Sequence, residues 1–557
     1  MASAETGSAH EVFNQSTPFE NFNLFTSDTI LQSVIAQEGG DPSSNRLTEL
    51  GAVTGSAEAA ALARQANENP PVLKSIDRYG NRQDVVEFHP AYHDLMTISM
   101  QHGLHCTSWE RDGSKARADQ GRNVERAAGL FMTTQMEAGH CCPITMTNAS
   151  VAVLNQQGDV ADSWLGKIFV HDYDQRFVPL DEKRSVTIGM GMTERQGGTD
   201  VRSNTTCAIP VEGGGAGEEY LVTGHKWFMS APMCDAFLIL AQAPGGLSCF
   251  LVPRLLPDGT PNSLRFQRLK NKLGNHSNAS SEVEFQKVHA WLIGEEGRGI
   301  TTIIEMVTYT RLDCAISSAG LMRQALANAI HHCNARTVFQ KKLIDQPLMR
   351  QVLADMTLDQ EAATALVIRL ARAFDGAAED PREASIARIM SPAIKYWVCK
   401  ALPGFAYEAM ECLGGNGYVE DSPLARLYRE APLNAIWEGS GNVMCLDVLR
   451  AINKDPEGLQ GILDGMIQCV DGEARLVNAI EKLRERFANP SGLEADVRYV
   501  VERLVHTVAG CLLLKSAPDA VSEAFVASRI KGSYRGHYGS LRGADINAIL
   551  ERSQPVY

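Results

Sequence analysis

The sequence lacks several features that would assign a protein to a class at once. No run approaches the roughly 18 apolar residues that a membrane-spanning helix needs, so no membrane partner is expected. Residues 1–10 lack the basic segment and apolar core of a secretory signal, which favours the cytoplasm. The 13 cysteines include no Cys-x-x-Cys pair, so the sequence predicts neither a disulfide framework nor a zinc ribbon.

Metal-binding patterns and positive charge are also scarce. The clusters His102-x-x-His105-Cys106, His140-Cys141-Cys142 and His331-His332-Cys333 have no partner cluster at zinc-site spacing, so we expect no metal. The formal net charge of -14 speaks against nonspecific attraction to nucleic acid over the whole surface. Residues 524–544 are an exception, because they contain basic residues and no acid. They form a candidate phosphate-binding patch, and the alternative is a solvated surface loop.

The chain, at 557 residues, is long enough for three or four domains. Apolar residues recur every three to four positions up to about residue 184, which predicts a helical domain. Residues 185–294 contain short β-branched and aromatic runs between turns and predict a small barrel or sandwich. Helical periodicity resumes over 295–450 and continues over 451–557. The expected fold class is α+β, mostly α, with a helical bundle and an extra C-terminal helical domain.

The stretch 434–442 places a single carboxylate, that of Glu438, between an aromatic residue and a turn rich in glycine and serine. A carboxylate held against apolar neighbours has a raised pKa, as the base that deprotonates a carbon acid requires. The small residues after it would let a planar ring system approach the backbone closely. The alternative is an ordinary loop with a solvated Glu.

Two segments of the β region carry the groups expected around a flat heterocycle. The loop over 189–200 combines hydroxyl groups and backbone N–H groups with glycines, which suits hydrogen bonds to the edge of a ring. Its candidate residues are Met190, Gly191, Met192, Thr193, Glu194, Gln196, Gly197, Gly198 and Thr199. The strand over 225–230 adds Phe228, Met229 and Ser230. The alternatives are a well-ordered edge loop and a core strand.

Together these motifs resemble the acyl-CoA dehydrogenase family, because they occur with others in that family's order. The further motifs are the turn Gly294–Gly299, the segment Arg336–Leu343 with Gln340 in place of a glycine, and the segments Glu411–Tyr418 and Tyr428–Glu430 before the Glu438 turn. The resemblance covers roughly residues 100–450. Thr308 departs from the family pattern, since many members carry an acidic residue three positions before the arginine that is Arg311 here.

The resemblance implies a helical domain, a middle β domain and a C-terminal four-helix bundle, assembled into homotetramers of paired dimers that bind FAD. It implies that Glu438 removes the proton α to a thioester carbonyl while hydride leaves the β carbon for the flavin. It also assigns Ile436, Trp437, Gly439, Ser440, Gly441 and Asn442 to a flavin-binding turn. Arg336, Phe339, Gly414 and Gly415 would approach the adenosine and pyrophosphate half of a neighbouring subunit's FAD.

The segments Leu247–Arg254, Lys272–Ser280 and Ile436–Arg450, with the long C-terminal extension, are similar to one branch of this family. Its members are flavoproteins of the bacterial adaptive response to DNA alkylation. That similarity implies binding of double-stranded DNA, weak dehydrogenase activity on acyl-CoA of the isovaleryl type, and protection of DNA or inactivation of alkylating small molecules. The residues expected to contact DNA are Arg450, Arg529, Lys531, Arg535 and Arg542.

Two other functions stay open. One is a catabolic short-chain or branched-chain acyl-CoA dehydrogenase whose C-terminal extension serves only packing. The other is a protein that binds flavin structurally and works through assembly or DNA contacts alone.

Overall fold

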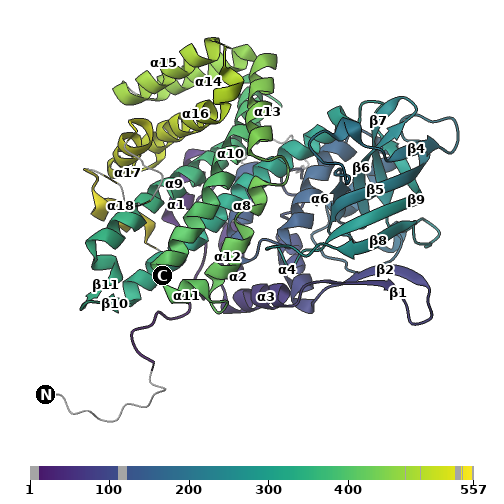
Figure 1. The fold of residues 1–557 in the computed structure, drawn as a ribbon, viewed down its shortest axis with the longest axis horizontal. Helices are drawn as coiled ribbons and strands as arrows, with labels where there is room; N and C mark the ends of the chain where they lie inside the picture. The colour runs from purple at the N-terminus through teal and green to yellow at the C-terminus, as the bar shows by residue number, and fades with distance from the viewer. Residues whose placement is uncertain are drawn as a thin grey trace.

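A computed structural model describes residues 12–110, 122–470, 472–489, 491–532, 538, 541 and 543–554. Figure 1 shows a β domain at one end of an elongated molecule and stacked helices over the rest. The expected class, α+β with mostly helices, is confirmed, as is the order of helical domain, β domain and bundle. No helix among the described residues is long and apolar enough to cross a membrane.

The N-terminal region is built from helices and one hairpin. The helices are α1 (Thr29–Gln37), α2 (Asn45–Thr54), α3 (Ala57–Glu68), α4 (Pro90–Gln101), α5 (Arg122–Met136), α6 (Cys141–Leu154) and α7 (Gly158–Ile168). The hairpin of β1 (Val72–Ile76) and β2 (Arg82–Glu87) was not expected within a helical domain. Its turn forms because the Asp77 carboxylate accepts hydrogen bonds from the backbone N–H groups of Tyr79 and Asn81.

The β domain is a seven-stranded sheet that closes on itself. Its strands are β3 (Ile188–Gly191), β4 (Cys207–Pro210), β5 (Glu219–Ser230), β6 (Ala236–Ala243), β7 (Gly246–Pro253), β8 (Leu264–Leu269) and β9 (Ser280–Ile293). Strands β6, β4, β5, β9 and β7 pair in that order, and β7 pairs again with β6, so these five form a closed ring. The ring encloses a separate hydrophobic core, as a small barrel requires, while β3 and β8 lie outside the ring and pair with β6 and β9.

The bundle follows with α8 (Gly299–Ala335), α9 (Pro347–Gly376), α10 (Pro381–Cys412) and α13 (Gly441–Lys454). Shorter elements connect them: the hairpin β10 (Thr337–Val338) and β11 (Lys341–Lys342), α11 (Gly415–Tyr418), α12 (Pro423–Glu430), and the 3-10 turns η3 (Leu343–Asp345) and η4 (Leu433–Ala435). Helices α8, α9 and α10 pack on one another, and α8 and α9 also pack on α5, so the N-terminal helices and the bundle share one core.

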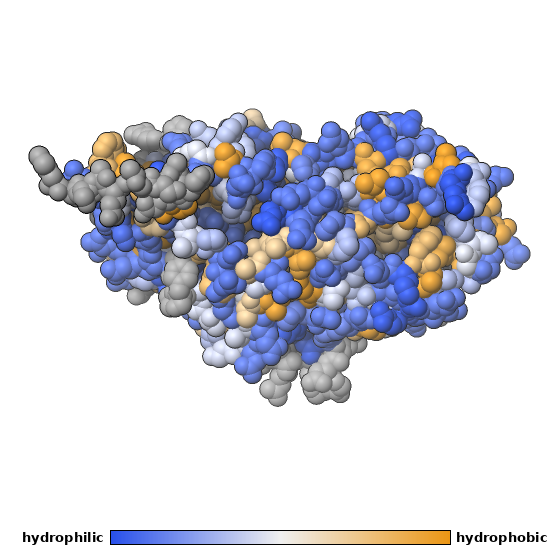
Figure 2. All heavy atoms as spheres, turned by 90° about the horizontal axis from the view of Figure 1, so that it is seen from below, coloured by the Kyte–Doolittle hydropathy of each residue, from blue (hydrophilic) through white to orange (hydrophobic). Residues whose placement is uncertain are grey.

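The C-terminal domain consists of α14 (Pro456–Cys469), α15 (Ala474–Ala488), α16 (Leu493–Ser516), α17 (Asp519–Phe525), the π-helical turn η5 (Val526–Ile530) and α18 (Ile546–Ser553). Helix α16 packs on α9, α10 and α13, so this domain extends the core of the bundle. Figure 2 shows a largely hydrophilic face with separate hydrophobic patches.

Candidate functional site

Glu438 lies in a strained turn between η4 and helix α13. Its φ of 57° is in the left-handed region, which a residue with a side chain adopts at a cost. Gly439 follows with φ 103°, so two successive residues depart from ordinary backbone geometry. Residues held in such conformations cluster at active sites, because the surrounding structure must hold the turn in place.

The environment of the Glu438 carboxylate suits a base. Burial raises its pKa above the ordinary value of 4.5, while a hydrogen bond from Thr310 and the charges of Lys395 and Arg311 oppose that rise. The Thr310 hydroxyl, on α8, donates to Glu438 Oε2 at 2.7 Å. The net direction is upward, so the carboxylate is more basic than a solvated one.

Lys395 supports the turn from helix α10. Its buried ammonium donates to the carbonyl oxygens of Asn434 at 2.9 Å, Trp437 at 2.9 Å and Gly439 at 2.8 Å. An ammonium has three N–H donors, so all of them are used on the main chain around Glu438. Lys395 was not among the predicted site residues, although a lone lysine within the apolar run Pro392–Val398 is a usable signal.

Arg311 joins the turn to α13. Its Nε donates to the carbonyl oxygen of Glu438 at 3.1 Å, and its Nη1 donates to Asp447 at 2.7 Å. Arg388 donates to the other Asp447 oxygen at 2.9 Å. The guanidinium groups hold the pKa of Asp447 below its ordinary value, although burial acts against them. Residues from α8, α10 and α13 therefore fix the main chain on both sides of Glu438.

The β domain meets this turn on its other side. Trp437 packs against the hydrophobic core of the β domain. The Cys142 thiol interacts both with Ser230 of β5 and with the Glu438 charge, and burial raises its pKa to about 11. Ser230 and Glu438 are therefore both neighbours of the Cys142 thiol.

The loop after β3 is exposed to solvent. Gln196, Gly197, Gly198 and Thr199 are exposed, and the backbone N–H of Trp227 donates to the Thr193 carbonyl oxygen at 2.8 Å. Phe228 is exposed beside them. Lys270 Nζ lies 3.5 Å from the centroid of the Trp227 ring. An exposed phenylalanine and an exposed glycine-rich loop thus lie on neighbouring segments, and their contact with a flavin ring stays a prediction.

Two predicted contacts are wrong as regards their side chains. Glu194 is fully buried, where its carboxylate accepts from Lys226 Nζ at 2.9 Å and from the backbone N–H of Thr205 at 2.7 Å. It shapes the loop rather than facing a ligand. Met229 is also fully buried, because alternation along β5 turns it into the barrel while Phe228 faces outward.

A second set of predicted residues lies at the opposite end of the molecule. Arg336 precedes the β10–β11 hairpin, and Phe339 lies in its turn. Gly414 precedes α11, and Gly415 is its first residue; both elements lie far from the β domain in Figure 1. Phe339 is 90% exposed and Tyr418 81% exposed. A Cβ added at Gly414 or Gly415 would meet no atom within 4 Å, so both glycines have open space in front of them.

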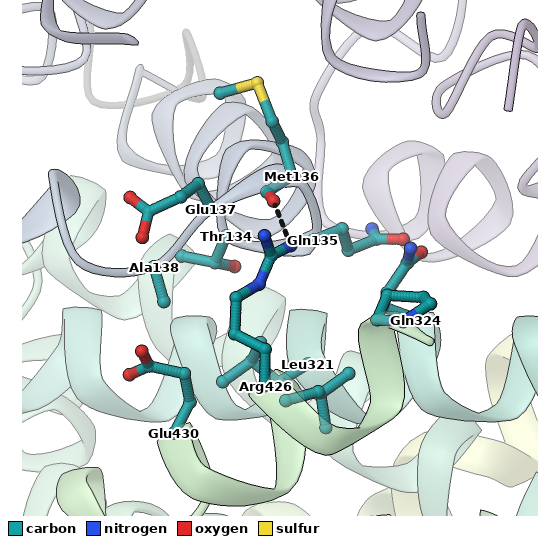
Figure 3. A pocket seen from close by; sticks show the side chains of 11 residues that line it. Thr134, Gln135, Met136, Glu137, Ala138, Leu321, Gln324, Arg426 and Glu430 are labelled. Carbon is teal, nitrogen blue, oxygen red and sulfur yellow. Dashed lines mark hydrogen bonds between the residues drawn. The ribbon is translucent and has the colours of Figure 1, made fainter. Parts of the chain in front are cut away.

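A buried acid lies in a small pocket between α5, α8 and α12, which Figure 3 shows. Burial and the neighbouring Glu137 carboxylate raise the pKa of Glu430 to about 7. Arg426 reaches across the pocket and donates to the Met136 carbonyl oxygen at 3.1 Å, while Glu137 and Glu430 lie to one side of it. The backbone N–H of Asn275 donates to Glu430 Oε1 at 2.5 Å, which ties α12 to the loop before β9.

The predicted DNA contacts divide into three groups. Arg450 and Lys531 are exposed, as phosphate contacts must be. Arg535 and Arg542 lie outside the described residues. The prediction for Arg529 is wrong, because its buried guanidinium forms ion pairs with Asp355 at 2.8 Å and Asp359 at 2.9 Å. Two carboxylates of α9 meet this positive charge inside the protein, so it does not face solvent.

Comparison with known proteins agrees with the geometry. The sequence profile of the adaptive response protein AidB N-terminal domain matches residues 14–175. The profiles of the acyl-CoA dehydrogenase middle and C-terminal domains match residues 189–288 and 297–453. The last range includes Glu438 and each of the residues that fix its turn.

Relatives that match most of the chain point to the same family. The chain is 46% identical to the putative acyl-CoA dehydrogenase AidB of Escherichia coli, covering 93% of each chain. It is 29% identical to acyl-CoA dehydrogenase family member 11 of Caenorhabditis elegans, covering 82% of this chain and 78% of the relative. The crystal structure of C. elegans ACDH-11 in complex with C11-CoA has the same fold, with a TM-score of 0.84 at 24% identity, covering 95% and 94% of the two chains.

The chain therefore belongs to the acyl-CoA dehydrogenase family and is an FAD-dependent oxidoreductase. Within that family it is AidB-like, since both its N-terminal profile and its E. coli relative carry that name.

Proposed function

We propose that this protein oxidises the α,β bond of an acyl-CoA with Glu438 as the base, and that it also associates with double-stranded DNA in the adaptive response to alkylation. The observation that carries the first part is the strained, buried Glu438 turn, held by Thr310, Lys395 and Arg311. The first part rests on geometry within the described residues. The second rests mainly on the likeness to AidB.

The chain's own residues would position and deprotonate the substrate. The raised pKa of Glu438 favours uptake of the proton α to the thioester carbonyl. FAD, when bound, would accept the hydride that leaves the β carbon. The apolar surroundings of the turn, including Trp437, limit water and so preserve the basicity of the carboxylate.

The separation of the two predicted FAD-contacting sets supports an oligomer. The loop after β3 and the Glu438 turn lie together, whereas Phe339 and Gly414 lie at the far end of the bundle. The two sets of residues in one chain lie too far apart to contact the same FAD molecule. The second set would therefore contact the FAD of a neighbouring subunit. Paired dimers, forming a homotetramer, would cover the exposed Phe339 and Tyr418 side chains.

DNA association is proposed for the C-terminal domain. Lys531 is its exposed basic residue from the predicted set, Arg450 is exposed on the preceding helix α13, and Arg535 belongs to the same acid-free stretch of sequence as Lys531. The profile of an adaptive response protein over residues 14–175 favours a role in protecting DNA or inactivating alkylating agents. The alternative, a catabolic dehydrogenase with a packing extension, has support in the shared core of α16 with the bundle.

Glu438→Gln tests the catalytic part. In anaerobic titrations with isovaleryl-CoA, we expect bleaching of the flavin in the wild type and none in the variant, with FAD retained in both. Glu457→Gln, an exposed glutamate of α14, is the control and should bleach like the wild type. Equal bleaching rates for Glu438→Gln and wild type would remove Glu438 as the base.

A salt series of DNA binding tests the second part. The variant is Lys531→Ala with Arg535→Ala, and the control is Arg64→Ala on α3, also an exposed arginine. Each lost phosphate contact should lower the slope of log affinity against log salt by about 0.9. Binding that ignores salt, or that the double variant leaves unchanged, would favour the catabolic alternative.

A further inference from the structure

One group of metal-ligating side chains lies apart from the Glu438 turn. Cys106, Glu110 and His171 each offer one ligand atom, and these three atoms lie within 4.8 Å of one another. It is the one group of three or more such residues found among the residues that the structure describes. Sequence analysis expected no metal, because Cys106 had no partner cluster at a recognisable spacing and His171 is 65 residues further along the chain.

The turn after α4 supplies two of the three groups. Residues 102–109 continue α4 as a series of turns, and Glu110 follows directly, four positions after Cys106. The Cys106 thiol donates a hydrogen bond to Glu110 Oε1 at 3.4 Å, and a bound ion would replace the thiol proton. Two ligands on a tetrahedral zinc ion, with bonds near 2.3 Å to sulfur and 2.1 Å to oxygen, lie about 3.6 Å apart. The separation therefore suits one shared ion.

The backbone around the third group is shaped to receive it. Gly103 has a φ of 65°, and a Cβ at that position would lie 2.6 Å from Cε1 of His171, so only glycine leaves space for the imidazole. The ring of His105 is hydrogen-bonded through Nε2 to the carbonyl oxygen of Val170, at 3.2 Å, which holds the residue next to His171. His171 Nε2 in turn contacts Glu110 Oε1.

We propose that Cys106, Glu110 and His171 bind a divalent cation of the zinc class, which clamps residues 170–174 to the turn after α4. A thiol, an imidazole and a carboxylate are a ligand set that suits zinc or cobalt better than calcium or magnesium. The side chains of Glu110 and His171 are 36% and 38% exposed, so a fourth position is open to water. The site is independent of the proposed dehydrogenase and DNA functions.

The chain contains a second histidine–glutamate pair, similar to His171 and Glu110, that serves as a control without a thiol. His289 and Glu219, in β9 and β5, make the same imidazole–carboxylate contact with side-chain exposures of 40% and 36%. If a histidine–glutamate contact alone held the ion, both places would bind it. The proposal requires that only the place with Cys106 does.

Equilibrium dialysis of the purified, flavin-loaded protein against Zn²⁺, with metal counted by mass spectrometry, tests the site. We expect one ion per chain, lost in Cys106→Ser and in His171→Gln but retained in His289→Gln. Loss of a direct ligand should weaken binding by at least the 10- to 100-fold typical of an outer-shell partner. With Co²⁺, the wild type should show a thiolate-to-cobalt charge-transfer band that Cys106→Ser lacks.

Several results would overturn the proposal. They are no stoichiometric ion in the wild type, equal binding by Cys106→Ser, equal binding by His171→Gln, or a loss in His289→Gln as large as in His171→Gln. His171 is a surface residue and serine is nearly isosteric with cysteine, so both variants should fold. Retained flavin absorbance would confirm that. A flavin reduction assay should give the wild-type result in either case, which separates failure of this site from failure of the proposed function.

Discussion

The hydroxyl of Thr310 donates a 2.7 Å hydrogen bond to the carboxylate of Glu438, which follows it by 128 residues in the chain. This bond stabilises the charged carboxylate and so opposes the effect of burial, which raises the pKa. The basicity of Glu438 is thus a balance between its apolar surroundings and one hydroxyl group.

Thr310→Val should shift the pH dependence of flavin reduction. Loss of the hydrogen bond raises the pKa of Glu438 further, so the acidic limb of kcat/KM should move to higher pH by up to about one pH unit. At pH values well above the acidic limb, kcat/KM should change little. The control is Thr308→Val, because the Thr308 hydroxyl donates within its own helix, to the Ile304 carbonyl oxygen at 2.8 Å. An acidic limb that does not move would mean that the hydroxyl does not tune the base.

Lys395→Met should lower kcat strongly. It removes three hydrogen bonds to the main chain around Glu438 and a positive charge that holds the pKa of Glu438 down. Displacement of a catalytic group by about 1 Å can cost about 100-fold in rate, so a loss of that order is expected. The acidic limb should also rise in pH, which a purely structural role would not cause. Lys400→Met, an exposed change on the same helix, should leave both quantities unchanged.

Glu430→Gln should alter how stability depends on pH. The pKa of Glu430 is about 7 in the folded protein, against an ordinary value of 4.5. Between those values the folded protein holds a proton that the unfolded chain releases, so wild-type stability falls as pH rises through this window. Relative to the wild type, the free energy of unfolding of the variant should therefore increase between pH 4.5 and 7, by on the order of 1–3 kcal/mol.

Urea midpoints across that pH range would measure the gain of Glu430→Gln. Glu379→Gln, an exposed glutamate, serves as the control and should show no such change with pH. A constant difference between Glu430→Gln and wild type at all pH values would contradict the raised pKa.

Arg529→Ala should destabilise the protein rather than act on DNA binding directly. Its guanidinium is buried between Asp355 and Asp359, and removing one partner of a buried ion pair costs about 3–5 kcal/mol. The thermal midpoint should fall clearly. Lys531→Ala, an exposed change two residues later, should leave the midpoint unchanged. An unchanged midpoint for Arg529→Ala would contradict the buried contact.

Much of the fold and of the central turn could be predicted from local sequence. Helical and alternating periodicities located the helical regions and the β domain, because each element must turn an apolar face to a core. The β1–β2 hairpin was missed, since two short strands within a helical region carry little periodic signal. Glu438 and its glycines were found because neighbours in the chain define that turn.

The sequence by itself determined the family and the order of helical domain, β domain and bundle, and it singled out Glu438 as the candidate base, since these depend on motifs of adjacent residues. Only the tertiary structure decided which distant groups act on them. Lys395 reached the Glu438 turn, Arg529 entered the core opposite Asp355 and Asp359, and His171 came beside Cys106. The physical reason is that burial and the pairing of charges depend on contacts between segments, which residue type and spacing along the chain do not specify.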